Sequence, residues 1–149
     1  MLVESVFEAQ KIPIKYTHDG KNVSPPLELI DVPLNAVSLV IIMDDPDAPN
    51  GTFDHWIVWN IPPNLKRLGE GAAELNRVSP SPMHGINGFG TTDYQGPSPP
   101  KGKPHHYHFK VFALDTQLKL KEGATKKQVE DAMNGHILSQ AELIGIYQR

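Results

Sequence analysis

Two acidic residues, two histidines and a tyrosine in this chain could together form a polar binding site. Asp45 and Asp47 follow a continuous β-branched segment, and their i, i+2 spacing predicts that both carboxylates point to one side. His55 opens the next predicted strand, and His105 opens a later strand with Tyr107 on the same face. Because imidazole and phenol groups donate hydrogen bonds, this set predicts a pocket for a phosphate or carboxylate ligand.

The long segment 79–104 leads directly into His105 and is rich in proline and glycine. It contains few charges, and hydrophobic residues are spaced through it, which is unlike a disordered linker. An ordered loop of this length is usually functional. Its last part, YQGPSPPKG at 94–102, contains glycines that allow a close backbone approach and an anion-binding nest of N–H groups. The alternative interpretation is a structural proline-rich loop beside a surface histidine cluster.

Metal binding and catalysis are alternatives that the same residues leave open. The acidic run DDPDAP at 44–49 is typical of a turn, and its prolines do not match the spacing of a calcium loop. His106 and His108 could hold a metal on the opposite strand face, but such a pair is more typical of a solvated surface.

An enzyme could use Asp45, His55 and His105 as an acid–base dyad or as a two-histidine, one-carboxylate metal site. The chain has no cysteine and no GxSxG elbow to supply a nucleophile. We therefore expect no catalytic residue, no metal site and no cofactor.

The elements that must position these residues are mostly strands. Alternation and β-branched runs predict strands at 2–7, 37–43, 55–61, 105–114 and 143–147, with a loop at 17–26. Thr125 as N-cap and Gln128 three residues later predict the start of one helix. A helical stripe of hydrophobic residues continues that element in the order Val129, Ala132, Met133, Ile137 and Leu138.

Composition restricts the class of protein. The chain has 149 residues, the size of one domain, and we expect a single domain over 1–149. Its net charge of −3 argues against a nucleic-acid partner. The longest apolar run, Leu39 to Met43, is too short to span a bilayer, and the first residues do not resemble a signal peptide. We therefore expect a cytoplasmic protein with no integral membrane association.

Several blocks together resemble one known family. They are DPDAP at 45–49, His55-Trp56, GINGFG at 85–90, and YQGPSPPKG at 94–102 followed by His105-x-Tyr107. In this order they are similar to the signature blocks of the phosphatidylethanolamine-binding protein family, also called the Raf kinase inhibitor protein family. The segments 12–27 and 136–149 resemble its bacterial and archaeal branch, so the match runs from about residue 12 to the end of the chain.

The resemblance implies a mostly β fold of two antiparallel sheets with Greek-key connections, long Gly/Pro loops and one late helix. It also implies a small cavity that binds anions. The ligand-binding residues carried over by motif are Asp45, Asp47, His55, Gly96, Pro99, Pro100, His105 and Tyr107. The chain departs from eukaryotic members in the short segment 50–54, and in lacking their C-terminal helix after Arg149.

We therefore expect a non-catalytic protein that binds a small anionic or zwitterionic phosphate-containing ligand such as a phosphorylated headgroup. One alternative is an inhibitor or regulator of a kinase or protease that acts through the pocket rim, with an unknown protein target. A second alternative is a hydrolase that depends on histidine and aspartate. On the resemblance alone, a homodimer is the oligomeric state to test.

Overall fold

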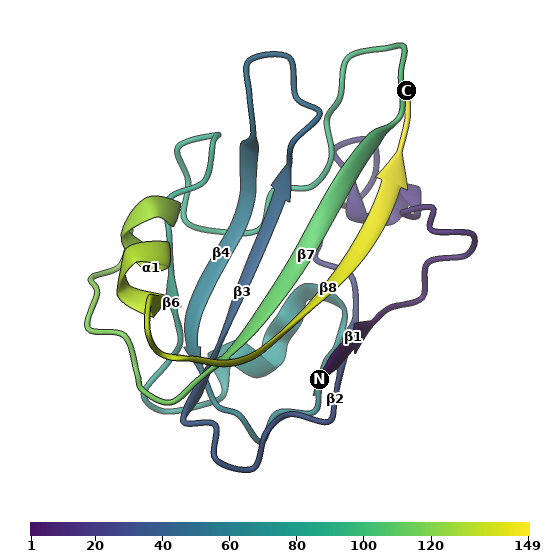
Figure 1. Ribbon diagram of the computed structural model, residues 1–149. Helices are drawn as coiled ribbons and strands as arrows, with labels where there is room; N and C mark the ends of the chain where they lie inside the picture. Colours follow the sequence, from purple (N-terminus) through teal and green to yellow (C-terminus); the bar gives the residue numbers. More distant parts are fainter.

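Antiparallel strands in two sheets form most of the regular secondary structure, which confirms the predicted mostly β fold class (Figure 1). The computed structural model describes residues 1–149. The smaller sheet has the order β1-β2-β5, with β1 at Leu2–Glu4, β2 at Leu27–Ile30 and β5 at Arg67–Leu68. The larger sheet has the order β6-β4-β3-β7-β8, with β6 at Met83–His84, β4 at Phe53–Ile61, β3 at Ser38–Asp45, β7 at His105–Leu114 and β8 at Ile137–Tyr147. The helices are η1 at Ile14–Tyr16, η2 at Glu70–Asn76 and α1 at Lys126–Met133.

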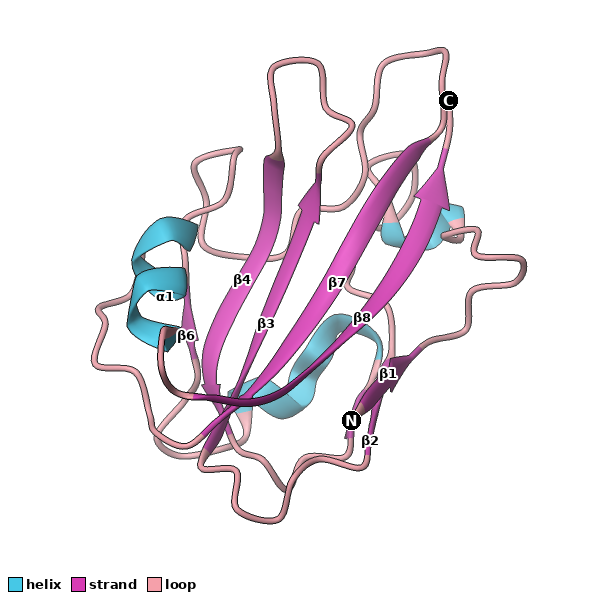
Figure 2. Ribbon diagram, in the orientation of Figure 1, coloured by secondary structure: helices cyan, strands magenta, loops and turns pink.

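The central strand β3 is buried along its whole length, as its continuous β-branched run predicts. Leu39, Ile41 and Met43 belong to an 18-residue core cluster that also contains buried residues of the smaller sheet. Val40 and Ile42 point to the other face, where a nine-residue cluster includes buried side chains of α1. The larger sheet is therefore the middle layer, with the smaller sheet on one face and α1 on the other (Figure 2).

Strand β7 alternates as its sequence predicts. Tyr107, Phe109 and Val111 are fully or almost fully buried on the side of the larger core cluster, and His105 begins this face. His106 and His108 point to the opposite, more exposed face. The bounds of this strand match the prediction, so its alternation places His105 and Tyr107 together at one end of the sheet.

The predicted helix begins correctly and ends early. Thr125 and Gln128 form the expected capping box, but α1 ends at Met133. Gly135 adopts a φ of +84°, a left-handed conformation that stops a helix. Ile137 and Leu138 instead begin β8, which is 11 residues long. The predicted terminal strand at 143–147 ends at the correct residue but begins six residues too late. None of the helices has the length and apolar character needed to cross a membrane.

Short elements account for the remaining differences. The first strand ends at Glu4, and the small strands β2 and β5 and the helix η2 were not predicted. Such elements contain too few residues for periodicity to separate from chance. The segment 79–104 contains only the two-residue β6, and the remainder is an irregular loop that reaches the site end of β7.

Candidate functional site

A cavity of about 310 Å³ lies at the end of the larger sheet where β3 stops and where β4 and β7 begin. Its walls come from several parts of the chain, and Phe89 of the loop 85–104 joins the four segments named next. They are the end of β3, the turn 48–52 with the start of β4, the loop around Ser98 to Pro100, and the start of β7. Figure 1 shows these loops at one end of the molecule, beside the last residues of the chain.

Asp45 and His105 form a buried pair in this cavity. Asp45 is 3% exposed and His105 is 6% exposed. The distance from Nδ1 of His105 to Oδ2 of Asp45 is 2.6 Å, so the imidazole donates to the carboxylate. The other carboxylate oxygen, Oδ1, accepts the backbone N–H of Asp47 at 2.8 Å. Both oxygens of Asp45 are therefore hydrogen-bonded, and Nε2 is the free nitrogen of His105.

His55 is held in one tautomer by the backbone of the proline-rich loop. Its Nδ1 lies 2.6 Å from the carbonyl oxygen of Gln95. Because a carbonyl can only accept, Nδ1 must carry the proton, and in the neutral ring Nε2 holds a lone pair. Burial lowers the pKa of His55, an effect that the Gln95 carbonyl and the charge of Asp45 partly oppose. His55 is therefore a neutral imidazole at neutral pH.

A β-bulge explains how His55 reaches the cavity. Met43 pairs with Trp56 and Asp44 pairs with Asp54, so His55 is an extra residue in β4. A bulge interrupts strict alternation, which allows two neighbouring residues to face the same side. Trp56 accordingly lies in the larger core cluster while His55 lines the cavity.

Tyr107 contributes a hydroxyl that has no hydrogen-bond partner within the chain. The residue is 1% exposed, and its ring lies edge-on to His55 with centroids 5.3 Å apart. Burial, together with the charge of Asp45, raises the pKa of Tyr107 above its ordinary value. The hydroxyl therefore stays protonated and can donate to a group in the cavity.

Two phenylalanines form an aromatic wall that the sequence interpretation missed. Phe53 and Phe89 line the cavity, with ring centroids 4.9 Å apart in an edge-to-face arrangement. Phe53 also lies 5.1 Å from the ring of His55. The sequence feature that relates to this wall is the glycine at 88 within GINGFG. A Cβ on Gly88 would overlap the ring of Phe53, so glycine at this position allows the two segments to pack closely. The turn 48–52 and Ser98 also line the cavity and were not predicted.

Six of the eight predicted ligand-binding residues line the cavity, namely Asp45, His55, Pro99, Pro100, His105 and Tyr107. Asp47 does not, and the expectation that it joins Asp45 there was wrong. Its Oδ2 accepts from the backbone N–H and from Nδ1 of His106, both at 2.8 Å, on the exposed side. The strand ends at Asp45, so alternation no longer applies two residues later.

Gly96 also lies outside the cavity, which corrects the expectation that it forms an anion-binding nest. Its N–H donates to Oδ1 of Asn22 at 2.7 Å and is not free for a ligand. A Cβ at this position would overlap the carbonyl oxygen of Tyr16. Glycine is needed here because two loops pack backbone to backbone, and that contact supports the wall formed by Pro99.

Tyr147 and Arg149, at the end of the chain, stabilise the part of the cavity wall formed by Pro99. Arg149 donates to both carboxylate oxygens of Asp19 at 2.9 Å and to the carbonyl of Pro99 at 3.1 Å. The hydroxyl of Tyr147 donates to Oδ2 of the same Asp19 at 2.5 Å. Arg149 thereby joins the loop that contains Asp19 to the proline-rich loop at the cavity.

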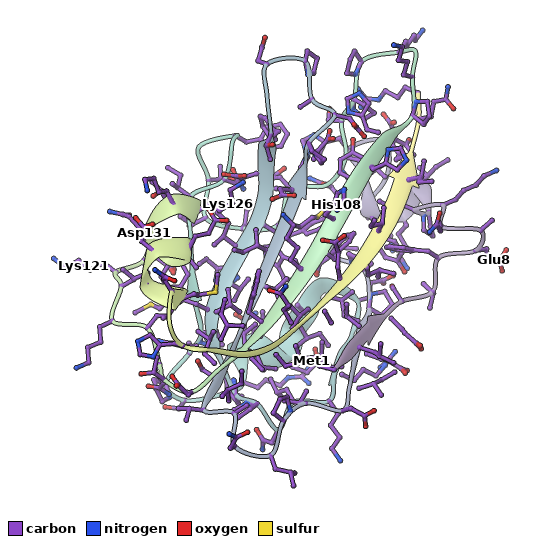
Figure 3. The ribbon with its side chains drawn as sticks, viewed as in Figure 1. Met1, Glu8, His108, Lys121, Lys126 and Asp131 are labelled. Atoms are coloured by element: carbon purple, nitrogen blue, oxygen red, sulfur yellow. The ribbon has the colours of Figure 1, made fainter.

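Two lysines near the site, Lys110 and Lys126, lie on the opposite face of the larger sheet. Lys126 lies at the start of α1 (Figure 3). It pairs with Asp54 at 2.7 Å and with Asp44 at 3.3 Å, and Lys110 also pairs with Asp44. No lysine or arginine side chain lines the cavity. The structure also contains no group of three or more histidine and acidic side chains arranged to hold a metal ion.

Comparisons with known proteins agree with this architecture. A profile described as phosphatidylethanolamine-binding protein matches residues 3–148. A UPF0098 protein of Pyrococcus abyssi is 52% identical over 99% of this chain and 84% of its own. A structure of a putative phosphatidylethanolamine-binding protein homolog, CT736 from Chlamydia trachomatis, is 40% identical, with a TM-score of 0.89 over 99% of this chain and 97% of that chain. The E. coli protein YbcL, described as a member of the mammalian PEBP family, is 30% identical, with a TM-score of 0.88 over 99% of this chain and 98% of that chain.

Proposed function

Because the chain belongs to the phosphatidylethanolamine-binding protein family, we propose that it is a non-catalytic binding protein whose cavity accepts the phosphate of a small ligand. The shared chemistry is a phosphate group, either free or on a phosphorylated headgroup. The observation that carries this proposal is the hydroxyl of Tyr107, a donor without a partner on a buried side chain in the cavity. The hydroxyl oxygen itself is accessible from the cavity, so a ligand there can accept its hydrogen bond.

The surroundings of Tyr107 support a small ligand with one polar end. The imidazoles of His55 and His105 lie beside the ring of Tyr107. The aromatic wall of Phe53 and Phe89 lies against the ring of His55 and supplies the apolar part of the lining. Binding sites commonly combine such an apolar lining with a few polar groups that fix orientation. Phe89 is 42% exposed, so the aromatic wall reaches the rim, where a substituent on the phosphate can leave the cavity.

Calorimetric titration with three ligands tests the proposal and separates the possible sources. The arms are inorganic phosphate, phosphoethanolamine, and vesicles that contain phosphatidylethanolamine. Binding of the first two without the vesicles would indicate a soluble ligand, and vesicle binding would indicate a lipid headgroup. Binding of none of the three would contradict the proposal.

Two tyrosine variants give the test a matched control. Tyr107→Phe removes only a hydroxyl without a partner in the chain, so stability should change little while phosphate affinity falls by about tenfold, as expected for one hydrogen bond to a charged group. The hydroxyl of Tyr94 donates to the carbonyl of Tyr16 at 2.7 Å and lies outside the cavity lining. Tyr94→Phe should therefore lower stability and leave phosphate affinity unchanged.

A second candidate function, a hydrolase, is favoured by the His105–Asp45 hydrogen bond. A carboxylate on Nδ1 leaves Nε2 free to act as a general base, which is the arrangement of many hydrolases. Ser98 lines the same cavity, but it makes no hydrogen bond to His105. Turnover of p-nitrophenyl esters or phosphates that disappears in His105→Ala would establish this function in place of the non-catalytic one.

A further inference from the structure

The hydrogen-bond polarity of the cavity restricts the anion that can occupy it. Nδ1 of His55 is committed to the carbonyl of Gln95, and Nε2 has no partner within the chain although the residue is 3% exposed. A neutral His55 thus presents a lone pair to the cavity. Tyr107 presents the opposite polarity, an O–H donor. One side of a bound ligand must therefore donate a hydrogen bond and another side must accept one.

The charges around His55 lead to the same requirement. The charges of Asp45 and Asp54 raise the pKa of His55, and the charge of His18 lowers it. The remaining neighbours are the aromatic rings of Phe53, Phe89 and Tyr107. No lysine or arginine lines the cavity, and Arg149, whose positive charge acts on Tyr107 from outside the lining, is already paired with Asp19. An anion with fewer negative charges fits this environment better.

Extending the proposed function, on which this inference rests, we propose that His55 is a specificity-determining residue and that the cavity selects a singly protonated oxyanion. The P–O–H group of a phosphate monoanion donates to Nε2 of His55, and an unprotonated oxygen of the same phosphate accepts from the hydroxyl of Tyr107. The ligand class is a phosphate or phosphate monoester that keeps one acidic proton. A sulfate or sulfonate, which has no such proton near neutral pH, is discriminated against.

Proton uptake is the direct consequence. At about pH 7.5 most free phosphate is dianionic, so the complex should hold more than half a proton more than the separated protein and ligand, and this uptake should approach one proton as the pH rises. Calorimetric titration of inorganic phosphate in buffers of different ionisation enthalpy measures this number without any variant. In parallel, the ³¹P chemical shift of bound phosphate should remain that of the monoanion as the pH rises from about 6 to about 8.

Sulfate provides a probe of the same shape that lacks the proton. We expect it to bind at least about tenfold more weakly than phosphate at about pH 7.5, because an oxygen lone pair would face the lone pair of Nε2. The contrast should become smaller in acidic solution, where His55 itself takes up a proton and becomes a donor.

His55→Asn is the informative variant, because an asparagine amide can keep the donor to Gln95 while removing Nε2. Proton uptake should fall towards zero, and the affinities for phosphate and sulfate should approach each other. His136→Asn is the matched control, since His136 is an exposed histidine that pairs with Asp115 and lies outside the cavity lining. It should preserve both the proton uptake and the selectivity of the wild type.

The outcomes separate the two claims. Phosphate binding without proton uptake, or with equal affinity for sulfate, would overturn the inference about His55 while leaving the proposed phosphate site intact. Unchanged selectivity in a folded His55→Asn protein would also overturn it. Failure of both anions to bind would overturn the proposed function and this inference together.

Discussion

His105 donates its Nδ1 proton to Oδ2 of Asp45 over 2.6 Å, although 60 residues separate the two in sequence. The register of β3 against β7 explains this contact. Asp44 pairs with His108, so the same antiparallel register places Asp45 opposite Tyr107. His105, two residues before Tyr107, is then the diagonal neighbour of Asp45 on the same face. The pair therefore depends on the core that fixes this register, where Ile41 pairs with Val111 and Met43 pairs with Phe109.

Loss of Asp45 should cost much more stability than loss of Asp47. Asp45→Ala removes a buried carboxylate and leaves His105 without its partner, which we expect to lower the free energy of unfolding by about 3 kcal/mol. The side chain of Asp47 is 41% exposed, so Asp47→Ala should cost about 1 kcal/mol or less. Urea denaturation measures both values, and equal costs would show that the buried pair has no special role.

Gly88 should be intolerant of alanine because of Phe53. A Cβ at Gly88 would overlap the phenyl ring, so Gly88→Ala should lower stability by about 1–3 kcal/mol through overpacking. Phe53→Ala removes the obstacle, and Gly88→Ala should cost less in that background. Urea denaturation of the wild type, the two single variants and the double variant measures the free energies of unfolding for a double-mutant cycle. Additive effects would contradict a steric origin at this contact.

The residues of the site that could be predicted are those on regular strands. Period-two alternation is sufficient to place His105 and Tyr107 on one face, and the β-branched run ending at Asp45 is sufficient to place that carboxylate at the sheet end. The positions of Asp47 and Gly96 depend on loop geometry. The first is determined by hydrogen bonds to His106, and the second by a backbone contact with Tyr16 from a remote loop.

The limits of periodicity appear again in β8. Ile137 and Leu138 continue a helical stripe, but Asn134 and Gly135 end the helix before the stripe is complete. This Asn-Gly stop was visible in the sequence and outweighs the hydrophobic pattern. The bulge at His55 differs in kind, because it is visible only when the pairing of β4 with β3 is known.

Arg149 and Asp19 should act as a unit on the wall of the cavity. Arg149→Gln removes the ion pair and the bond to the Pro99 carbonyl, so amide exchange in the segment 96–102 should become faster. Asp19→Asn should produce a smaller change of the same kind, and the double variant should add little to Arg149→Gln. Hydrogen exchange followed by mass spectrometry measures this effect. Unchanged exchange in Arg149→Gln would show that the wall is held by other contacts.

The same ion pair should weaken in acid. The hydrogen bond from Arg149 to Asp19 is the main reason why the pKa of Asp19 is lowered, and the hydroxyl of Tyr147 makes a second contribution. A carboxyl with a lowered pKa stabilises the folded state above its unfolded pKa, about 3.9, and this contribution is lost as the pH falls through the folded value. Exchange in 96–102 should therefore be slower in the wild type than in Asp19→Asn at neutral pH, and this difference should shrink only below about pH 4, where the Asp19 carboxyl takes up a proton. A difference that grows as the pH falls below about 4 would have the wrong sign.

Stability of the ligand-free protein should also depend on His55 at mildly acidic pH. Burial is the main cause that lowers the pKa of His55, so the unfolded chain takes up this proton at a higher pH than the folded protein does. The contribution of neutral His55 is therefore fully present above its unfolded pKa of about 6.5 and is lost as the pH falls below that value towards the folded pKa. In this window the slope from one group is at most about 1.4 kcal/mol per pH unit.

His55→Asn removes this dependence, and His84→Asn offers a comparison in the same window. Burial also lowers the pKa of His84, which lies on β6 outside the cavity lining. Urea denaturation between about pH 5 and about pH 8 should therefore show a flatter pH profile for each variant and a still flatter one for the double variant, since the two sites do not share a partner. Only His55→Asn should also alter phosphate binding. A wild-type profile that His55→Asn leaves unchanged would mean that the folded protein accommodates a charged imidazole in the cavity, and the neutral tautomer assigned to His55 would then be wrong.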